Sequence, residues 1–223
     1  MKRTAIVFGA TGLTGSNLTE ELTGSDTYDK ILVFTRRKSP AVTHQKIREI
    51  EFDITNIEAV KEGIKGDDIF CCLGTTIKKA GSQEAFRKVD LEAPAKIAEI
   101  AAANGVKQFI VISSIGADPK SRNFYLRTKG QMEVAVQKQH FEGIAILRPS
   151  MITGKRKEFR MAEEAGKMIF RLVEKLLFGK LRKYRSITAK TIARAMVNIA
   201  LKPQDKIVFE SHEIQKLAGV TGN

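Results

Sequence analysis

Tyr125 and Lys129 are the residues whose types and spacing best fit proton-transfer chemistry. They lie four positions apart in a predicted helix, which places both on one face. A phenol is a poor base at neutral pH, but a nearby ammonium favours its phenolate form. Ser114 ends the preceding predicted strand, where its hydroxyl can hold a substrate oxygen. With a hydride donor beside them, these three side chains can reduce a carbonyl or oxidise an alcohol.

A glycine-rich turn near the start of the sequence offers a place for such a donor. The apolar run 4–8 ends in GATGLTGS, with Gly9, Gly12 and Gly15 leading into a predicted helix. These glycines allow a sharp turn, close approach of a pyrophosphate and tight packing of helix on strand. The turn therefore predicts a bound dinucleotide, with Thr14 among the surrounding residues. An ordinary strand-to-helix turn is the alternative interpretation.

Two arginines follow the second predicted strand, about 20 residues beyond the glycine turn, where a dinucleotide presents its adenosine ribose. The strand 31–35 ends in Arg36 and Arg37, and no carboxylate stands there to hold both ribose hydroxyls. Guanidinium groups match a 2′-phosphate in charge and geometry. We therefore expect NADP(H) to be preferred over NAD(H), although a solvated basic loop gives the same pattern.

Two later strand ends complete the predicted dinucleotide site. Asp53 ends the predicted strand 46–54, where it can meet an adenine amino group or cap a helix at 56–62. The strand that begins at residue 68 runs into Gly74 and Thr75. A glycine at this point leaves bare backbone against which a cofactor ribose can lie.

Strands and helices alternate along the sequence in the manner of a parallel, doubly wound α/β sheet. Further strands are predicted at 109–112, 144–147 and 207–209. Further helices are predicted at 82–104, 122–139, 189–201 and 212–218, and Pro94 is a bend or boundary inside the first of them. Residues 78–81 are expected to form an exposed loop. We expect a single domain over residues 1–223.

The positive charge is concentrated late in the sequence. Of the formal net charge of +13, residues 148–185 contribute +8, from 12 Lys/Arg against 4 Asp/Glu. We expect 150–185 to be a basic, mostly helical segment that covers the substrate, with Phe159, Met161 and Phe170 in the wall of its pocket. The amphipathic pattern also allows a membrane-surface or partner-binding helix. No aromatic residues interleave with the charge as base stacking requires, so we expect no nucleic-acid binding.

Composition excludes several other classes of protein. No apolar span reaches about 18 residues, so no membrane-spanning helix is expected. Cys71 and Cys72 are the only cysteines and cannot form a metal cage, so we predict no metal. Free cysteines and the absence of a secretory signal predict a cytoplasmic protein. We expect it to be a monomer or a homodimer.

Several motifs together resemble a known family. GATGLTG, Ser114 and YLRTK resemble the short-chain dehydrogenase/reductase superfamily in its atypical, extended-like branch, which also includes epimerase-like enzymes. FTRRK, CCLGTT, SSIGAD, NFYLRTKGQME and LRPS are similar to the oxidoreductase Tat-interacting protein family and its bacterial relatives. The resemblance covers nearly the whole chain. It implies an NADP(H)-binding Rossmann fold with a Ser-Tyr-Lys centre.

The resemblance also implies a role for individual residues. The cofactor would contact Thr11, Gly12, Leu13 and Ser16 at the diphosphate, Arg36 and Arg37 at the 2′-phosphate, Leu73 and Gly74 at the ribose, Tyr125 and Lys129 at the catalytic centre, and Ile152 and Arg160 in a late loop. Many superfamily members carry a helical asparagine that organises a proton relay. The corresponding stretch here, Lys88 to Asp90, has none.

Two functions fit these features. The first is an NADP(H)-dependent oxidoreductase that acts on a small carbonyl or hydroxyl compound whose identity the sequence does not specify. The alternative is an NADP(H)-binding regulatory or interaction module with little or no turnover. In that case the basic segment would present a surface to a protein partner.

Overall fold

The computed structural model describes residues 2–36, 44–154 and 184–220. Its main sheet has seven strands in the order β3-β2-β1-β4-β5-β6-β9, and each neighbouring pair is parallel. The strands are β1 (Arg3–Phe8), β2 (Tyr28–Thr35), β3 (Ile47–Glu51), β4 (Asp68–Cys71), β5 (Gln108–Ile112), β6 (Gly143–Arg148) and β9 (Val208–Glu210). A small second sheet pairs β7 (Ile152–Thr153) with β8 (Ile187–Thr188).

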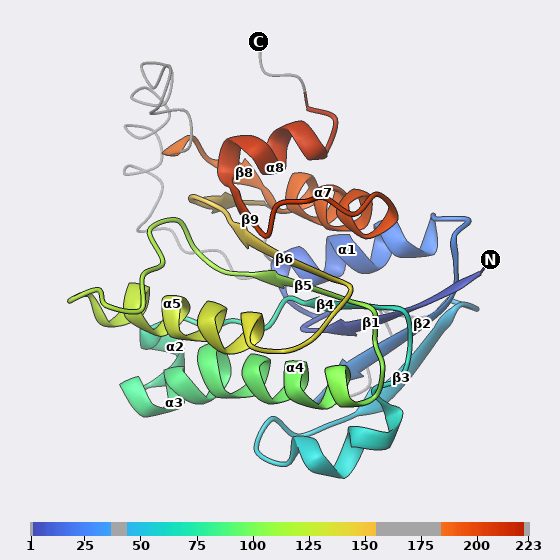
Figure 1. The fold of residues 1–223 in the computed structure, drawn as a ribbon, viewed down its shortest axis with the longest axis horizontal. Helices are drawn as coiled ribbons and strands as arrows, with labels where there is room; N and C mark the ends of the chain where they lie inside the picture. The colour runs from blue at the N-terminus through green and yellow to red at the C-terminus, as the bar shows by residue number, and fades with distance from the viewer. Residues whose placement is uncertain (1, 37–43, 155–183, 221–223) are drawn as a thin grey trace.

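Helices cover both faces of the main sheet (Figure 1). One face carries α1 (Leu13–Thr23), α7 (Ala189–Leu201) and α8 (Ser211–Leu217). The other carries α2 (Ile77–Ala80), α3 (Gln83–Arg87), the π-helical turn η3 (Lys88–Glu92), α4 (Ala93–Ala103) and α5 (Phe124–Gln137). The 3-10 helix η2 (Ile57–Gly63) follows β3. The predicted doubly wound α/β fold is confirmed.

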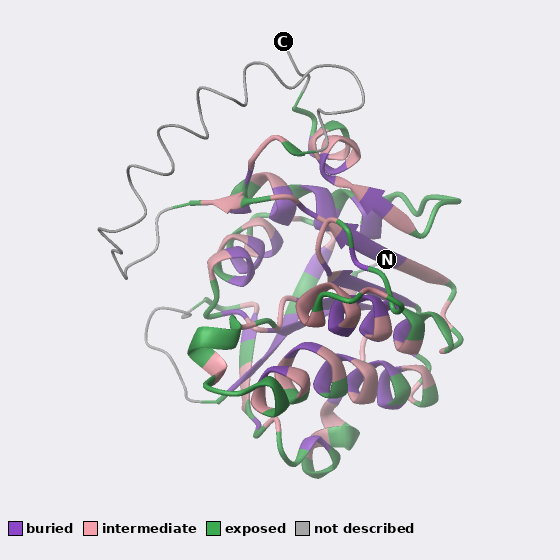
Figure 2. Cartoon of the chain, turned by 90° about the vertical axis from the view of Figure 1, so that its left-hand side faces the viewer, coloured by how far each residue is buried: buried purple, intermediate pink, exposed green. Residues whose placement is uncertain are grey.

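The central strand shows why an unbroken apolar run forms this sheet. Successive side chains of a strand point to opposite faces, so a strand covered on both faces must be apolar throughout. In β1, Ala5 and Val7 join the cluster under α1 and α7, whereas Ile6 and Phe8 join the cluster under α4 and α5. All four are fully buried. Figure 2 shows buried residues, in purple, both on the strands and on the helices that cover them.

The structure confirms one predicted helix and corrects two other elements. The predicted helix 82–104 is confirmed as a continuous helical run over 83–103. It contains the π turn η3 between α3 and α4, and Pro94 is the second residue of α4, at the boundary expected there. Residues 78–81 are not a loop, since Thr76 caps the exposed helix α2 by accepting the Lys79 N–H. The strand predicted at 31–35 begins earlier, at Tyr28, whose ring is buried.

Most of the basic segment lies outside the described residues, and so do Phe159, Met161 and Phe170. Within the described ranges no helix is long and apolar enough to cross a membrane.

Candidate functional site

The glycine turn between β1 and α1 has the geometry that its sequence predicts. Gly9 has a φ of +83°, and a Cβ there would stand 2.6 Å from the Cys72 carbonyl oxygen. A Cβ on Gly15 would stand 2.1 Å from the Gly9 carbonyl oxygen. Both positions therefore require glycine. The Gly12 N–H donates to the Gly9 carbonyl (3.0 Å) and closes the turn.

The start of α1 is open to an anion. Gly12 caps the helix without a side-chain hydrogen bond, so the amides of the first turn remain available to a phosphate. Thr11, Gly12 and Ser16 are exposed around these amides, whereas Thr14 is buried. Leu13 is half-buried, and its Cδ1 would lie 2.9 Å from a Cβ on Gly154, so the chain after β7 passes over the turn.

The adenosine side of the predicted site is only partly described. Arg36 is exposed directly after β2, and Arg37 lies outside the described residues. Asp53 is exposed and accepts the Thr55 N–H (2.9 Å), a bond that lowers the pKa of this carboxyl. Asp53 thus closes a local turn. It does not cap the following helix, whose N-cap is Asn56.

The chain after β4 passes close to the predicted catalytic helix. Leu73 packs against the core, and Gly74 is exposed. A Cβ on Gly74 would lie 3.5 Å from Asp90 Oδ1 and 4.0 Å from Lys129 Nζ. The Thr75 N–H donates to Asp90 Oδ2 (2.9 Å). The backbone expected to meet a ribose therefore adjoins the ammonium predicted to assist catalysis.

Lys129 and Asp90 form a buried ion pair beside this backbone. Their Nζ and Oδ1 atoms are 2.7 Å apart, and their side chains are 6% and 1% exposed. Burial opposes the charged ammonium, but attraction to Asp90 and Tyr125 outweighs it and raises the pKa of Lys129 above its usual value. Lys129 is therefore a cation at neutral pH.

Asp90 is the site residue that the sequence prediction missed. Phe86, Asp90, Ala93 and Ile97 recur at helical spacing and all are buried. A carboxylate on the apolar face of a predicted helix was the available signal, because a buried charge requires a partner. The structure shows that this partner is Lys129 on α5.

Tyr125 lies on the same helix as Lys129. Asn123 begins the helix by accepting the Leu126 N–H (3.1 Å). The half-buried Tyr125 ring lies 5.6 Å from the ring of Phe86. Its hydroxyl has no hydrogen-bond partner among the described residues, so it remains available to a substrate oxygen.

The loop after β5 sits directly on α5. A Cβ on Gly130 would stand 2.2 Å from the Pro119 nitrogen, so the loop packs against the helix backbone next to Lys129. Ser114, in this loop, is half-buried, and its hydroxyl donates only a long bond to the Ile115 carbonyl (3.4 Å). Ser114 can therefore exchange that bond for one to a ligand.

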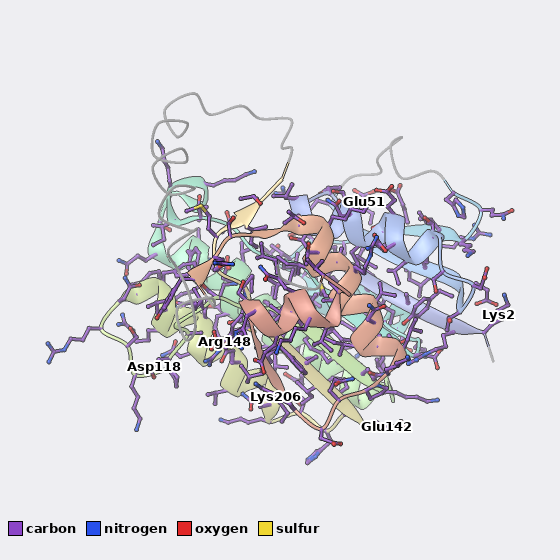
Figure 3. All side chains as sticks on the ribbon, turned by 90° about the horizontal axis from the view of Figure 1, so that it is seen from above. Lys2, Glu51, Asp118, Glu142, Arg148 and Lys206 are labelled. Carbon is purple, nitrogen blue, oxygen red and sulfur yellow. The ribbon has the colours of Figure 1, made fainter. Side chains whose placement is uncertain are left out.

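The neighbouring Ser113 is committed to the protein. It is buried and donates to Glu133 Oε1 (2.5 Å), and Glu133 is ion-paired with Arg148 (2.5 Å). Figure 3 shows Arg148, at the end of β6, on the same side as Asp118 and away from Lys2, which precedes β1. Ser113, Glu133 and Arg148 thus tie β5, β6 and α5 together behind the site.

The remaining predicted positions are Ile152 and Arg160. Ile152 is half-buried in β7, and Arg160 lies outside the described residues. No group of three His, Cys, Asp or Glu side chains in the described ranges is arranged to hold a metal ion. Burial raises the pKa of Cys71 to about 11, so this thiol stays protonated at neutral pH.

Comparison with known proteins agrees with this geometry. Residues 9–203 match the NAD(P)H-binding family. Protein HTATIP2 of Rattus norvegicus is 31% identical over 205 residues, which cover 90% of this chain and 82% of the relative. The protein FMP52 of Candida albicans, which is named mitochondrial, is 35% identical over 156 residues, or 68% of each chain.

Solved structures share the fold at low identity. The Bordetella bronchiseptica enzyme WbmG in complex with NAD has a TM-score of 0.69 and 14% identity, covering 98% of this chain and 77% of its own. The Helicobacter pylori ADP-L-glycero-D-manno-heptose-6-epimerase has a TM-score of 0.69 and 18% identity, covering 97% and 81%. The resemblance stated from the motifs is confirmed, and the chain belongs to the NAD(P)H-binding family, among the relatives of HTATIP2.

Proposed function

We propose that this chain is an NADP(H)-dependent oxidoreductase that moves a hydride to or from a small carbonyl or hydroxyl substrate. The observation that carries the proposal is the buried Lys129–Asp90 pair, which adjoins Gly74 and whose ammonium interacts electrostatically with Tyr125 of the same helix. Lysine is rarely buried in proteins, and the cost of burying it is explained if the ammonium serves the chemistry at this edge.

The residues around the pair have distinct proposed roles. A nicotinamide cofactor, when bound, supplies or accepts the hydride. The turn from Gly9 to Ser16 would bind the diphosphate of the cofactor, and Arg36 and Arg37 would bind its 2′-phosphate, with Asp53 near its adenosine end. The cofactor ribose would lie against Leu73, Gly74 and Thr75. The late loop that contains Ile152 and Arg160 would cover the bound cofactor. Ser114 would hold the substrate oxygen, Tyr125 would exchange a proton with it, and Lys129 would favour the phenolate and contact the ribose.

Replacing the tyrosine tests the proposed proton transfer. We expect Tyr125→Phe to retain NADPH binding, measured as thermal stabilisation, and to lose turnover by about 10²-fold or more in a screen of carbonyl compounds. Val134→Ala, at an exposed position of the same helix, is the control and should keep its activity. Full activity in Tyr125→Phe would remove this residue from the mechanism.

Replacing Arg36 tests the cofactor preference. A guanidinium bound to a phosphate contributes about 1.5–3 kcal/mol, so Arg36→Ala should weaken NADPH binding about tenfold or more and leave NADH binding unchanged. Wild-type protein should be stabilised more by NADPH than by NADH. Greater stabilisation by NADH would contradict the assignment of Arg36 and Arg37 to the 2′-phosphate.

One observation also favours the alternative of a cofactor-bound regulatory or interaction module. The Asp90 carboxylate lies 2.7 Å from Lys129 Nζ and offsets part of the positive charge that activates Tyr125. In this case NADPH would bind without turnover, and capture of a protein partner would depend on NADPH and on the basic residues of 155–185. A cytoplasmic location, a single domain and a monomer or homodimer remain predictions under either function.

A further inference from the structure

We propose that Asp90 is a positioning residue of this centre, which keeps Lys129 charged and fixed within reach of Tyr125 and joins it to the backbone of the cofactor loop. The inference rests on the proposed function, because it assigns a role to the Tyr125–Lys129 pair. Its test reads protonation directly and needs neither substrate nor cofactor.

The position of Asp90 between two elements is the first argument. It lies in the π-helical turn η3, and turns of this kind interrupt α-helices frequently at functional sites. One carboxylate oxygen lies against Lys129 of α5 (2.7 Å), and the other accepts the Thr75 N–H of the loop after β4 (2.9 Å). Asp90 Oδ1 is held by the ion pair and Oδ2 by a hydrogen bond, so the side chain links helix α5 to the loop after β4.

The charge balance around Lys129 is the second argument. Among the residues that the structure describes, the titratable groups that face its ammonium are Asp90 from η3, Tyr125 from α5 and Cys71 from β4. The Cys71 thiol is buried and neutral, and Tyr125 carries a charge only after it has lost its proton. Asp90 is thus the group that balances the buried ammonium before any reaction.

Other charges on the neighbouring elements have partners of their own. Arg87 of α3 donates to Gln131 of α5 (2.9 Å). Glu133 of α5 is ion-paired with Arg148 of β6. Arg87 and Glu133 therefore make contacts elsewhere, and Glu133 does not serve as the counter-ion of Lys129.

This balance predicts the consequence of neutralising Asp90. A buried ammonium without its counter-ion gives up its proton at lower pH. A neutral Lys129 no longer favours the phenolate, so the Tyr125 phenol would ionise at higher pH. If Lys129 instead kept its charge, the loss of the nearby carboxylate would favour the phenolate and the shift would have the opposite sign.

The experiment measures this ionisation by NMR on the full chain labelled with ¹³Cζ-tyrosine. The chain has three tyrosines, and Tyr125→Phe assigns the signal of interest. In Asp90→Asn we expect the midpoint of the Tyr125 titration to rise by about one pH unit or more. An unchanged or lowered midpoint would overturn the proposal.

Glu133→Gln provides a matched control on the same helix. Glu133 is also buried and ion-paired, so this variant loses a comparable contact without touching Lys129. We expect it to leave the Tyr125 midpoint in place. An equal shift in both variants would mean a general disturbance of α5 and would also overturn the proposal.

A second variant covers the case in which Asp90→Asn does not fold. Removing both charges in Asp90→Asn/Lys129→Met relieves the uncompensated ammonium, so the double variant should melt at a higher temperature than the single one. A double variant no more stable than Asp90→Asn would show that Asp90 acts through something other than Lys129. Failure of the proposed function would appear separately, as wild-type protein that does not turn over any substrate.

Discussion

Two buried aspartates, each beside a cation and near a tyrosine, lie at opposite ends of the parallel strands. We call these ends the amino edge, where the strands begin, and the carboxyl edge, where they end. At the amino edge, Asp68 begins β4, pairs with Arg3 and accepts the Tyr28 hydroxyl (2.7 Å). At the carboxyl edge, Asp90 pairs with Lys129, and Tyr125 lies on the same helix as this lysine.

The difference between the two lies in their hydrogen bonds. The Tyr28 hydroxyl donates a hydrogen bond to Asp68 Oδ2, and Arg3 also donates to the carbonyl of Ala200 at the end of α7 (2.9 Å). The Tyr125 hydroxyl has no such partner in the described part of the chain. At the amino edge these residue types stabilise the fold, whereas at the carboxyl edge the Tyr125 hydroxyl has no partner in the described residues, as the proposed function requires.

The largest effect should come from Asp68→Ala, which breaks the amino-edge cluster. The change leaves the buried Tyr28 hydroxyl without an acceptor and Arg3 without its counter-ion, so the free energy of unfolding should fall by about 3 kcal/mol or more in urea titrations. The NADPH affinity of the folded protein should stay the same. Asp67→Ala, at the half-buried neighbour, should cost less. Intact stability with lost NADPH binding would reverse the comparison.

The same carboxyl predicts a pH dependence of stability. Burial raises the pKa of Asp68 to about 6, against a usual value of 3.8, so between these pH values the folded chain holds a proton that the unfolded chain has lost. The contribution of Asp68 to stability is therefore present below about pH 4 and is lost as the pH rises through 6, by a total on the order of 3 kcal/mol. Subtracting the curve of Asp68→Asn from that of wild-type protein should show this fall. Parallel curves would contradict it.

A smaller effect separates the two tyrosines. Tyr28→Phe removes the hydrogen bond to the buried Asp68 Oδ2, while Arg3 still pairs with Oδ1, and should cost about 1–3 kcal/mol in urea titrations. Tyr125→Phe removes a hydroxyl without a partner in the described structure and should change stability by less than about 0.5 kcal/mol. An equal loss in both variants would show that Tyr125 is a structural residue like Tyr28.

The features predicted from sequence are those that depend on neighbouring residues. The glycine turn, the strand before it and the helix after it follow from a short stretch in which Gly9 and Gly15 admit no side chain. Tyr125 and Lys129 are one helical turn apart, so their spacing alone places them together. The alternation of strands and helices then fixes the parallel sheet.

The features that were missed depend on residues far apart in the sequence. Asp90 becomes a site residue only because α5 brings Lys129 against η3. Arg3, Tyr28 and Asp68 meet only because β1 lies between β2 and β4. The distinction between Ser113 and Ser114 is of the same kind, since Glu133 on another element engages the first and leaves the second available.

The smallest effect on stability is expected at the carboxyl edge itself, from Gly74→Ala. The new methyl group would lie 3.5 Å from Asp90 Oδ1 and 4.0 Å from Lys129 Nζ, which are ordinary contacts, so the free energy of unfolding should change by less than about 0.5 kcal/mol. In the proposed function a ribose would approach the backbone from the side that this methyl group occupies, so NADPH affinity in a fluorescence titration should fall about tenfold.

Gly9→Ala is the contrasting variant, because its methyl group would stand 2.6 Å from the Cys72 carbonyl oxygen at a φ of +83° and should reduce stability as well as binding. Unchanged NADPH affinity in a stable Gly74→Ala protein would mean that the cofactor does not lie against this backbone. The Lys129–Asp90 pair would then be a structural ion pair, like the cluster at the opposite edge.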